Sequence, residues 1–156
     1  MSTTKEPAKA GAGSGHATDP GRHPVVHKLN HIAIAVFDLE AAKVTFQKLG
    51  LEQSHEEVID RMKVRVACFP VGDVVIELVE SISEDSPVNR FLEKRGEGLH
   101  HLCFTVEDIG DSLKRAAEAG IDLLDEEPRR GAEGRRVAFL HPDSTHGALI
   151  ELCDEC

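Results

Sequence analysis

Four side chains that could bind a metal ion stand at corresponding places in short apolar segments of the sequence. Two are histidines, His31 and His101, near the starts of their segments, and two are glutamates, Glu77 and Glu151, inside theirs. Two imidazoles and two carboxylates suit a borderline divalent ion such as Co²⁺, Mn²⁺, Ni²⁺ or Zn²⁺. A six-coordinate ion would keep positions open for water or a substrate oxygen, which is typical of catalytic sites. We therefore predict that these four residues are ligands of one catalytic metal ion.

The two histidines belong to an internal repeat. They are 70 positions apart (101 − 31), and the same offset relates Asp38 to Asp108 and Gly50 to Gly120. An offset shared by a histidine, a helix start and a helix end indicates that a structural unit has been duplicated.

The pattern of apolar residues places the same elements in each copy. The first copy is expected to contain strands over 28–36, 51–59, 64–69 and 74–79 and a helix over 39–49, which Asp38 caps and Gly50 ends. The second is expected to contain strands over 99–106, 121–124, 136–140 and 148–152, a helix over 109–119 and a charged loop over 125–134. Alternating apolar residues indicate the strands, and apolar residues three or four apart indicate the helices.

These elements predict an α+β fold made of two tandem βαβββ modules. The modules span 27–82 and 98–154, a connector helix spans 86–95, and all of them form a single domain over 25–154. Residues 1–24 are rich in small residues and proline and are expected to form a disordered tail. We expect two sheets that face each other across a pseudo-twofold axis, which would bring the four predicted ligands together.

Strand alternation places each histidine on a face with small neighbours. His31 shares its face with Ala33 and Ala35, and His101 shares its face with Cys103 and Thr105. Small residues on both faces leave room for a cavity. A glutamate buried in an apolar strand must be paired, protonated or bound to metal, because a bare buried charge is too costly.

Each of these residues also has a structural interpretation. A single strand histidine is more often a hydrogen-bonded core residue, and a single strand glutamate more often lies on a solvated face. Four residues that obey one repeat favour the metal centre instead. Glu80 is a nearby acidic alternative to Glu77, and His100 is expected to pack or to contact a ligand from the other face. Surface positions are expected for His55, His141 and His146.

The composition argues against several partners. The formal net charge of −10 disfavours binding to nucleic acid and to an anionic membrane. The sequence contains no apolar run of transmembrane length and no secretory signal, so we expect a cytoplasmic protein with reduced cysteines. Cys153 and Cys156 form a C-x-x-C pair, which we interpret as a strand residue and a tail residue.

Several longer segments resemble the methylmalonyl-CoA epimerases, a family of the vicinal oxygen chelate superfamily. They are 29–36, 38–42, 85–87, 91–101, 125–132, 139–142 and 149–152, which together reach from about Lys28 to Asp154. His31, His101 and Glu151 match the family's metal ligands, and Glu77 matches the fourth, where glutamine also occurs. The sequence departs from the family pattern at 61–63, Arg-Met-Lys in place of Glu-Gln-Gly. It also departs at Val66, where some members have a glutamate that acts as a second base.

The resemblance implies a metal-dependent epimerase that interconverts (R)- and (S)-methylmalonyl-CoA in propionate metabolism, with Co²⁺ as the expected ion. Removing the C2 proton generates an enolate-type oxyanion, which a divalent ion stabilises. We expect Glu151 to act as one acid/base and Glu77, or a water, as the other. Candidate contacts for the phosphates of the acyl-CoA partner are Arg129, Arg130, Arg135 and Arg136, which could equally form a solvated loop. A homodimer is expected, since the modules leave sheet edges and helix faces to cover.

Three other functions use the same scaffold. A glyoxalase I-type lactoylglutathione lyase shares the metal and the proton transfer, but the segments 85–101 and 139–142 favour the epimerase. An iron-dependent ring-cleaving dioxygenase uses two histidines and one carboxylate, so the fourth candidate, Glu77, argues against it. A non-catalytic binding protein would need no metal ligands.

Overall fold

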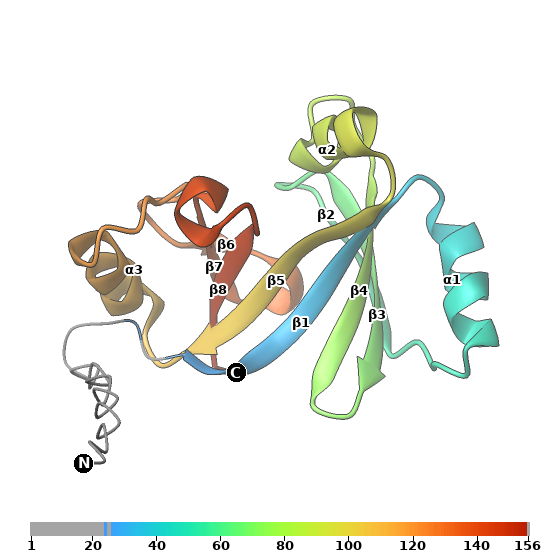
Figure 1. The fold of residues 1–156 in the computed structure, drawn as a ribbon. Coiled ribbons are helices and arrows are strands. Elements are labelled where there is room, and N and C mark those ends of the chain that lie inside the picture. The colour runs from blue at the N-terminus through green and yellow to red at the C-terminus, as the bar shows by residue number, and fades with distance from the viewer. Residues whose placement is uncertain (1–23, 25, 156) are drawn as a thin grey trace, which may run out of the picture.

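Eight strands form one curled sheet in the computed structural model, which describes Pro24 and residues 26–155. Apart from Pro24, the predicted tail over 1–24 therefore lies outside the described residues. The first half contains β1 (Val26–Val36), α1 (Leu39–Lys48), β2 (His55–Ile59), β3 (Val64–Val71) and β4 (Val74–Ser81). After α2 (Pro87–Arg95), the second half contains β5 (Gly98–Val106), α3 (Ile109–Glu118), β6 (Arg129–Arg130), β7 (Arg136–Leu140) and β8 (Ile150–Asp154). Two short 3₁₀ turns, Ala132–Gly134 and Pro142–Thr145, flank β7 (Figure 1).

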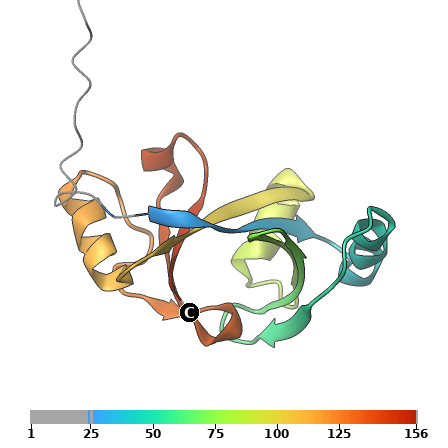
Figure 2. The same ribbon diagram turned by 90° about the horizontal axis from the view of Figure 1, so that it is seen from below.

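The two halves share one sheet, and this corrects the expectation of two separate facing sheets. The strand order is β2-β3-β4-β1-β5-β8-β7-β6, with β1 and β5 paired antiparallel at the centre. β4 is parallel to β1 and β8 is parallel to β5, so each half repeats the arrangement of the other. The sheet curls into a trough, with α1 and α3 at opposite sides of it (Figure 2).

The predicted helix ends are confirmed. The Asp38 side chain accepts a hydrogen bond from the Ala41 amide at 3.0 Å, and Asp108 accepts one from the Asp111 amide at 2.7 Å. Both carboxylates satisfy amides that the first helical turn leaves without a partner. Gly50 and Gly120 follow the helices with φ of 87° and 83°, a left-handed conformation that glycine adopts without a steric penalty.

Three segments differ from their predicted secondary structure. The strand expected over 51–59 begins only at His55, because Leu51 bonds back to the end of α1 through the Phe46 carbonyl. The strand expected over 121–124 is reduced to a single bridge between Leu123 and Leu140. The loop over 125–134 contains the two residues of β6, paired with the start of β7.

The helices pack on different faces of the sheet. Val88 and Leu92 of α2 pack on the same face as the histidines, where they contact Ala33, Ala35 and Val79. The small residues predicted to leave a cavity thus partly serve to let α2 approach β1 closely. On the opposite face, α1 packs on the cluster around Phe69 and Leu78, and α3 packs on the cluster around Val106 and Leu152. Within the described part of the chain, none of the helices combines the length and apolar content that crossing a bilayer would require.

Candidate metal centre and substrate cavity

The sheet register brings the four predicted ligands to the middle of the trough. Across β1 and β5, His31 pairs with Cys103 and Ala33 pairs with His101. Ala33 also pairs with Glu77 of β4, and Cys103 also pairs with Glu151 of β8. Ala33 therefore lies between Glu77 and His101, and Cys103 lies between His31 and Glu151. One small residue between each histidine and glutamate lets the longer side chains converge above it, since the concave face of a curled sheet directs them inward.

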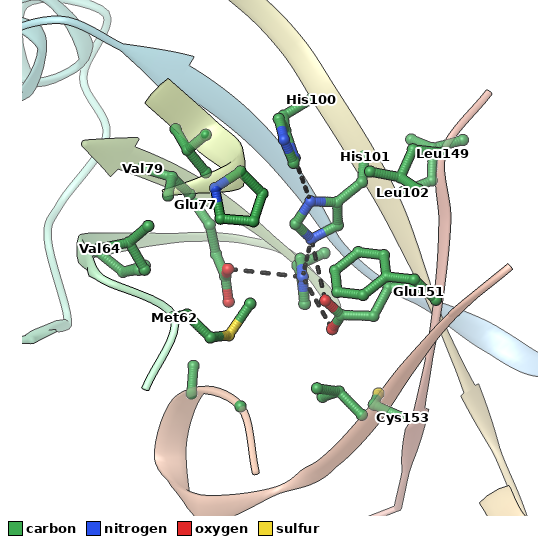
Figure 3. Close-up of a pocket in the computed structure, with 18 of the residues that line it drawn as sticks. Met62, Val64, Glu77, Val79, His100, His101, Leu102, Leu149, Glu151 and Cys153 are labelled. Carbon is green, nitrogen blue, oxygen red and sulfur yellow. Dashed lines mark hydrogen bonds and ion pairs between the residues drawn. The ribbon is translucent and has the colours of Figure 1, made fainter. Parts of the chain in front are cut away.

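The four side chains form one buried cluster, of which Figure 3 labels Glu77, His101 and Glu151. The Nε2 atoms of His31 and His101 are 3.1 Å apart. His31 Nε2 lies 3.5 Å from Glu77 Oε2 and 3.7 Å from Glu151 Oε1, and His101 Nε2 lies 3.3 Å from Glu151 Oε2. All four residues are between 4% and 9% exposed. The ligand atoms of His31, His101 and Glu151 all lie within 4.8 Å of one another, whereas Glu77 approaches the group through His31.

Hydrogen bonds around Asn30 decide the protonation of His31. Arg135 can only donate, and its Nη1 lies 3.1 Å from Asn30 Oδ1. That oxygen also lies 2.9 Å from His31 Nδ1, so Nδ1 carries the proton. The Asn30 amide nitrogen donates to Thr105 Oγ1 at 3.2 Å, which is consistent with this orientation. The lone pair of His31 is therefore on Nε2 and points into the cluster.

The cluster fits a divalent cation. Two nitrogens bound at about 2.1 Å and at right angles to one ion lie about 3 Å apart, close to the separation of the two Nε2 atoms. His101 Nδ1 lies 2.9 Å from His100 Nδ1, and this hydrogen bond can run in either direction. If His101 Nδ1 donates to His100, both Nε2 lone pairs face the cluster, and both imidazoles are already in the tautomer that binds a cation. If the bond runs the other way, the proton of His101 is on Nε2, and His101 must change its tautomer before it can bind a cation.

Burial shifts the pKa of every group in the cluster toward its neutral form. It raises the pKa of Glu151 to about 8, with the negative charge of Glu77 adding to the effect. It raises the pKa of Glu77 to about 7 and lowers that of His31 to about 4, helped at His31 by the positive charge of Arg135. The pKa of His101 also falls well below its ordinary value. Neutral imidazoles are good ligands, and a cation would replace the carboxyl protons.

Two further candidate residues, Glu80 and His100, lie beside the cluster and are not part of it. Glu80 is outside the cluster and lies 3.9 Å from Arg65, which favours Glu77 over Glu80 as the predicted ligand. His100 contacts His101 and packs edge-on against Phe91 with ring centroids 4.9 Å apart, so it has both of the roles expected of it.

The three other candidate histidines lie outside the metal cluster, as predicted. His55 and His146 are exposed, and the His141 side chain is 38% exposed at the edge of the cavity. Cys153 of the C-x-x-C pair is buried in a strand as predicted, and Cys156 lies outside the described residues.

The cluster opens into a cavity of about 910 Å³. Its wall on the side of the first half is apolar and includes Met62, Val64, Val66 and Val79. Of the four loop arginines, Arg129 and Arg135 line this cavity, whereas Arg130 and Arg136 do not.

Sequence reasoning missed what α2 contributes, namely a rim of Arg90, Lys94 and Arg95. The spacing of these charges at i, i+4 and i+5 on the connector helix was the available signal. It also missed Asn30, for which the only signal was its position directly before the first histidine.

The chain resembles proteins of known structure and name. It matches the family model of the Glyoxalase/Bleomycin resistance protein/Dioxygenase superfamily over residues 30–139. It is 41% identical over 131 residues to the ethylmalonyl-CoA/methylmalonyl-CoA epimerase of Cereibacter sphaeroides, covering 82% of this chain and 98% of that protein. The structure of methylmalonyl-CoA epimerase from Mycobacterium tuberculosis aligns with a TM-score of 0.80 and 34% identity, over 85% of this chain and 91% of that one. A methylmalonyl-CoA epimerase solved with methylmalonyl-CoA and NH4+ aligns with a TM-score of 0.80 and 35% identity, over 85% of this chain and 96% of that one.

Proposed function

We propose that this chain, which belongs to the Glyoxalase/Bleomycin resistance protein/Dioxygenase superfamily, is a methylmalonyl-CoA epimerase that interconverts the (R) and (S) forms. The observation that carries the proposal is the buried cluster of two histidines and two glutamates at the bottom of a large cavity. The similarity to named epimerases over most of the chain supports the same substrate.

The reaction needs a proton acceptor and a proton donor on opposite sides of one carbon. C2 of the substrate lies between a thioester and a carboxylate, so its proton is acidic. Glu151 and Glu77 reach the cluster from β8 and β4, on opposite sides of the central strand pair. We assign Glu151 as one acid/base and Glu77, or a water, as the other. Without a cation, burial raises the pKa of Glu77 to about 7 and that of Glu151 to about 8. A bound cation would lower both pKa values, so that each carboxylate could accept a proton at neutral pH.

His31, Glu77, His101 and Glu151 would hold the metal ion. A divalent cation bound there supplies Lewis-acid stabilisation of the negative charge that develops on the thioester oxygen. Nitrogen and carboxylate donors together suit Co²⁺, Mn²⁺, Ni²⁺ or Zn²⁺. We propose Co²⁺, the ion that the resemblance to the epimerase family implies. Within the chain, Asn30 orients His31, and the apolar wall of the cavity excludes water from the reacting carbon.

The proposal extends to the setting of the enzyme. We place it in the cytoplasm, in propionate metabolism, as a homodimer whose protomer is a single domain over 25–154. The open edge strands β2 and β6 and the large exposed side chains Phe37 and Leu99 support an additional contact surface.

Proton exchange at C2 tests the reaction directly. Methylmalonyl-CoA of one configuration is incubated with the metal-loaded protein in D2O, and deuterium at C2 and the configuration are followed by mass spectrometry and chiral analysis. We expect deuterium to enter C2 as the configuration becomes mixed. Glu151→Gln should slow this exchange by at least the factor of about 10² typical of a lost general acid or base. Exchange at the parental rate in that variant would refute the assignment of Glu151.

The glyoxalase I-type lyase is tested with the same preparation. Conversion of the hemithioacetal of methylglyoxal and glutathione, without exchange into methylmalonyl-CoA, would replace the epimerase by that activity. A ring-cleaving dioxygenase is disfavoured because a fourth ligand candidate, Glu77, lies 3.5 Å from His31.

A further inference from the structure

Four exposed cations border the cavity on the side of α2. Arg90, Lys94 and Arg95 line it from the helix, and Arg61 lines it from the turn between β2 and β3. The chain as a whole carries a net charge of −10, so a local group of positive charges at a cavity mouth is unusual for this protein. Like charges held together repel one another, and an anionic ligand relieves that repulsion.

The neighbouring carboxylates do not neutralise this rim. Asp85 is paired with Lys63 at 3.0 Å, Glu93 accepts from Asn89 at 3.1 Å, and Glu97 accepts from the Phe37 amide at 2.8 Å. Arg90 donates to the uncharged Asp85 carbonyl at 3.1 Å, and Arg95 stacks over the Phe91 ring at 5.8 Å. Among the described residues, no carboxylate lies within ion-pair distance of any of the four cations.

Of the four loop arginines that the sequence suggested as phosphate contacts, three are already paired with a carboxylate, and the fourth, Arg130, does not line the cavity. Arg129 is paired with Asp125 at 3.2 Å, Arg135 with Glu133 at 3.1 Å, and Arg136 with Asp154 at 2.5 Å. An anion at these positions would have to compete with a carboxylate that is already in place. The rim of α2 presents no such competitor.

An apolar wall connects the rim to the buried cluster. Val88 and Phe91 of α2 continue into the wall formed by Met62, Val64 and Val79, which ends beside Glu77. From the inside outward, the cavity therefore offers a polar metal-binding centre, an apolar passage and a cationic mouth. An acyl-CoA has the same order: a reacting acyl group, a pantetheine arm and a phosphorylated nucleotide.

We propose that the rim formed by Arg61, Arg90, Lys94 and Arg95 binds the phosphates of the CoA nucleotide. This inference rests on the proposed function for its ligand, a thioester of a phosphorylated nucleotide. It moves the phosphate site from the loop over 129–136 to the connector helix and the facing turn. The rim supplies affinity for the nucleotide and takes no part in the proton transfer.

The test measures binding of free CoA, which requires no catalysis. Calorimetry compares CoA with pantetheine for the native chain and for Arg90→Gln, Lys94→Gln and Arg95→Gln, alone and combined. Each lost cation should weaken CoA binding about threefold to fivefold, and the triple variant about 30-fold to 100-fold, because an exposed ion pair contributes little individually. Pantetheine binding and kcat should stay the same while KM for the acyl-CoA rises. Lys114→Gln, on the exposed side of α3, is the matched control and should bind CoA normally.

Two results would overturn the proposal while leaving the epimerase intact. One is CoA binding that is unchanged in the triple variant but weakened by Arg130→Gln, which would return the phosphates to the loop. The other is a lower melting temperature with normal CoA binding, which would show that Lys94 and Arg95 only complement the C-terminal end of the helix dipole. A native chain that neither binds CoA nor exchanges C2 would instead reject the proposed function, and this inference with it.

Discussion

Replacing Asn30 by alanine removes the acceptor that holds His31 in its metal-binding tautomer. Asn30 Oδ1 accepts from His31 Nδ1 at 2.9 Å and from Arg135 Nη1 at 3.1 Å. In Asn30→Ala, the Nδ1 proton of a 7% exposed imidazole loses its partner. The proton can then move to Nε2, which blocks the lone pair that would face the cation.

The size of the effect follows from the burial of His31. Leaving a buried donor without an acceptor costs about 1–3 kcal/mol, and loss of a hydrogen bond behind a ligating histidine typically lowers metal affinity about 10-fold to 100-fold. The two ranges agree, since a tenfold change corresponds to about 1.4 kcal/mol. We therefore expect the dissociation constant for the metal ion to rise about 10-fold to 100-fold in Asn30→Ala.

The assay is a metal titration against a competing chelator, combined with ¹⁵N NMR of the His31 ring to identify the protonated nitrogen. Asn30→Asp keeps an acceptor for both donors and should retain native affinity. Thr105→Val removes the third hydrogen bond of Asn30 and the 3.8 Å contact of Thr105 Oγ1 with Cys153 Sγ. It leaves both bonds of Asn30 Oδ1 in place and is the matched control. Native affinity in Asn30→Ala, with the proton still on Nδ1, would refute the assignment of Asn30 as a positioning residue.

Because burial raises the pKa of Glu151 to about 8 and of Glu77 to about 7, both carboxyls must release protons to a cation. Metal affinity should therefore rise about 10-fold to 100-fold per pH unit between pH 6 and 7 in calorimetric titrations, and a pH-independent affinity would contradict this. Ala33→Leu should lower the free energy of unfolding by about 1–3 kcal/mol in urea titrations, because Ala33 lies under α2. It should also abolish metal binding, because Ala33 lies between two predicted ligands, and normal metal binding would contradict this. Asp108→Ala should lower the free energy of unfolding by about 1 kcal/mol in urea titrations, because it removes the cap of α3. Its metal affinity should stay the same.

The repeat explains why so much of the fold and of the candidate site could be predicted from the sequence. Because the offset of 70 relates His31 to His101, their equivalent places on β1 and β5 follow once the two strands pair antiparallel. The helix ends at Asp38 and Gly50 are local features, set by capping and by glycine conformation, so the sequence alone indicates them.

The features that were missed depend on long-range packing. Pairing of β1 with β5 joins residues about 70 positions apart, and nothing in either segment distinguishes one continuous sheet from two facing sheets. The hydrogen bond from Arg135 to Asn30 joins a loop to a strand 105 positions away, so neither residue signals its role locally. The segment 121–124 has the residue pattern of a strand but pairs with β7 only at Leu123 and Leu140. Strand formation depends on such pairing, which the local sequence does not determine.

The most direct test of the central claim measures metal content and epimerisation on the same sample. The protein is analysed for bound metal and for C2 exchange of methylmalonyl-CoA, stripped with a chelator, and then titrated with Co²⁺. We predict that exchange disappears with the metal and returns in proportion to it, reaching its maximum at one ion per chain. Exchange at the full rate in the stripped protein would contradict the claim that the two histidines and two glutamates act through a shared cation.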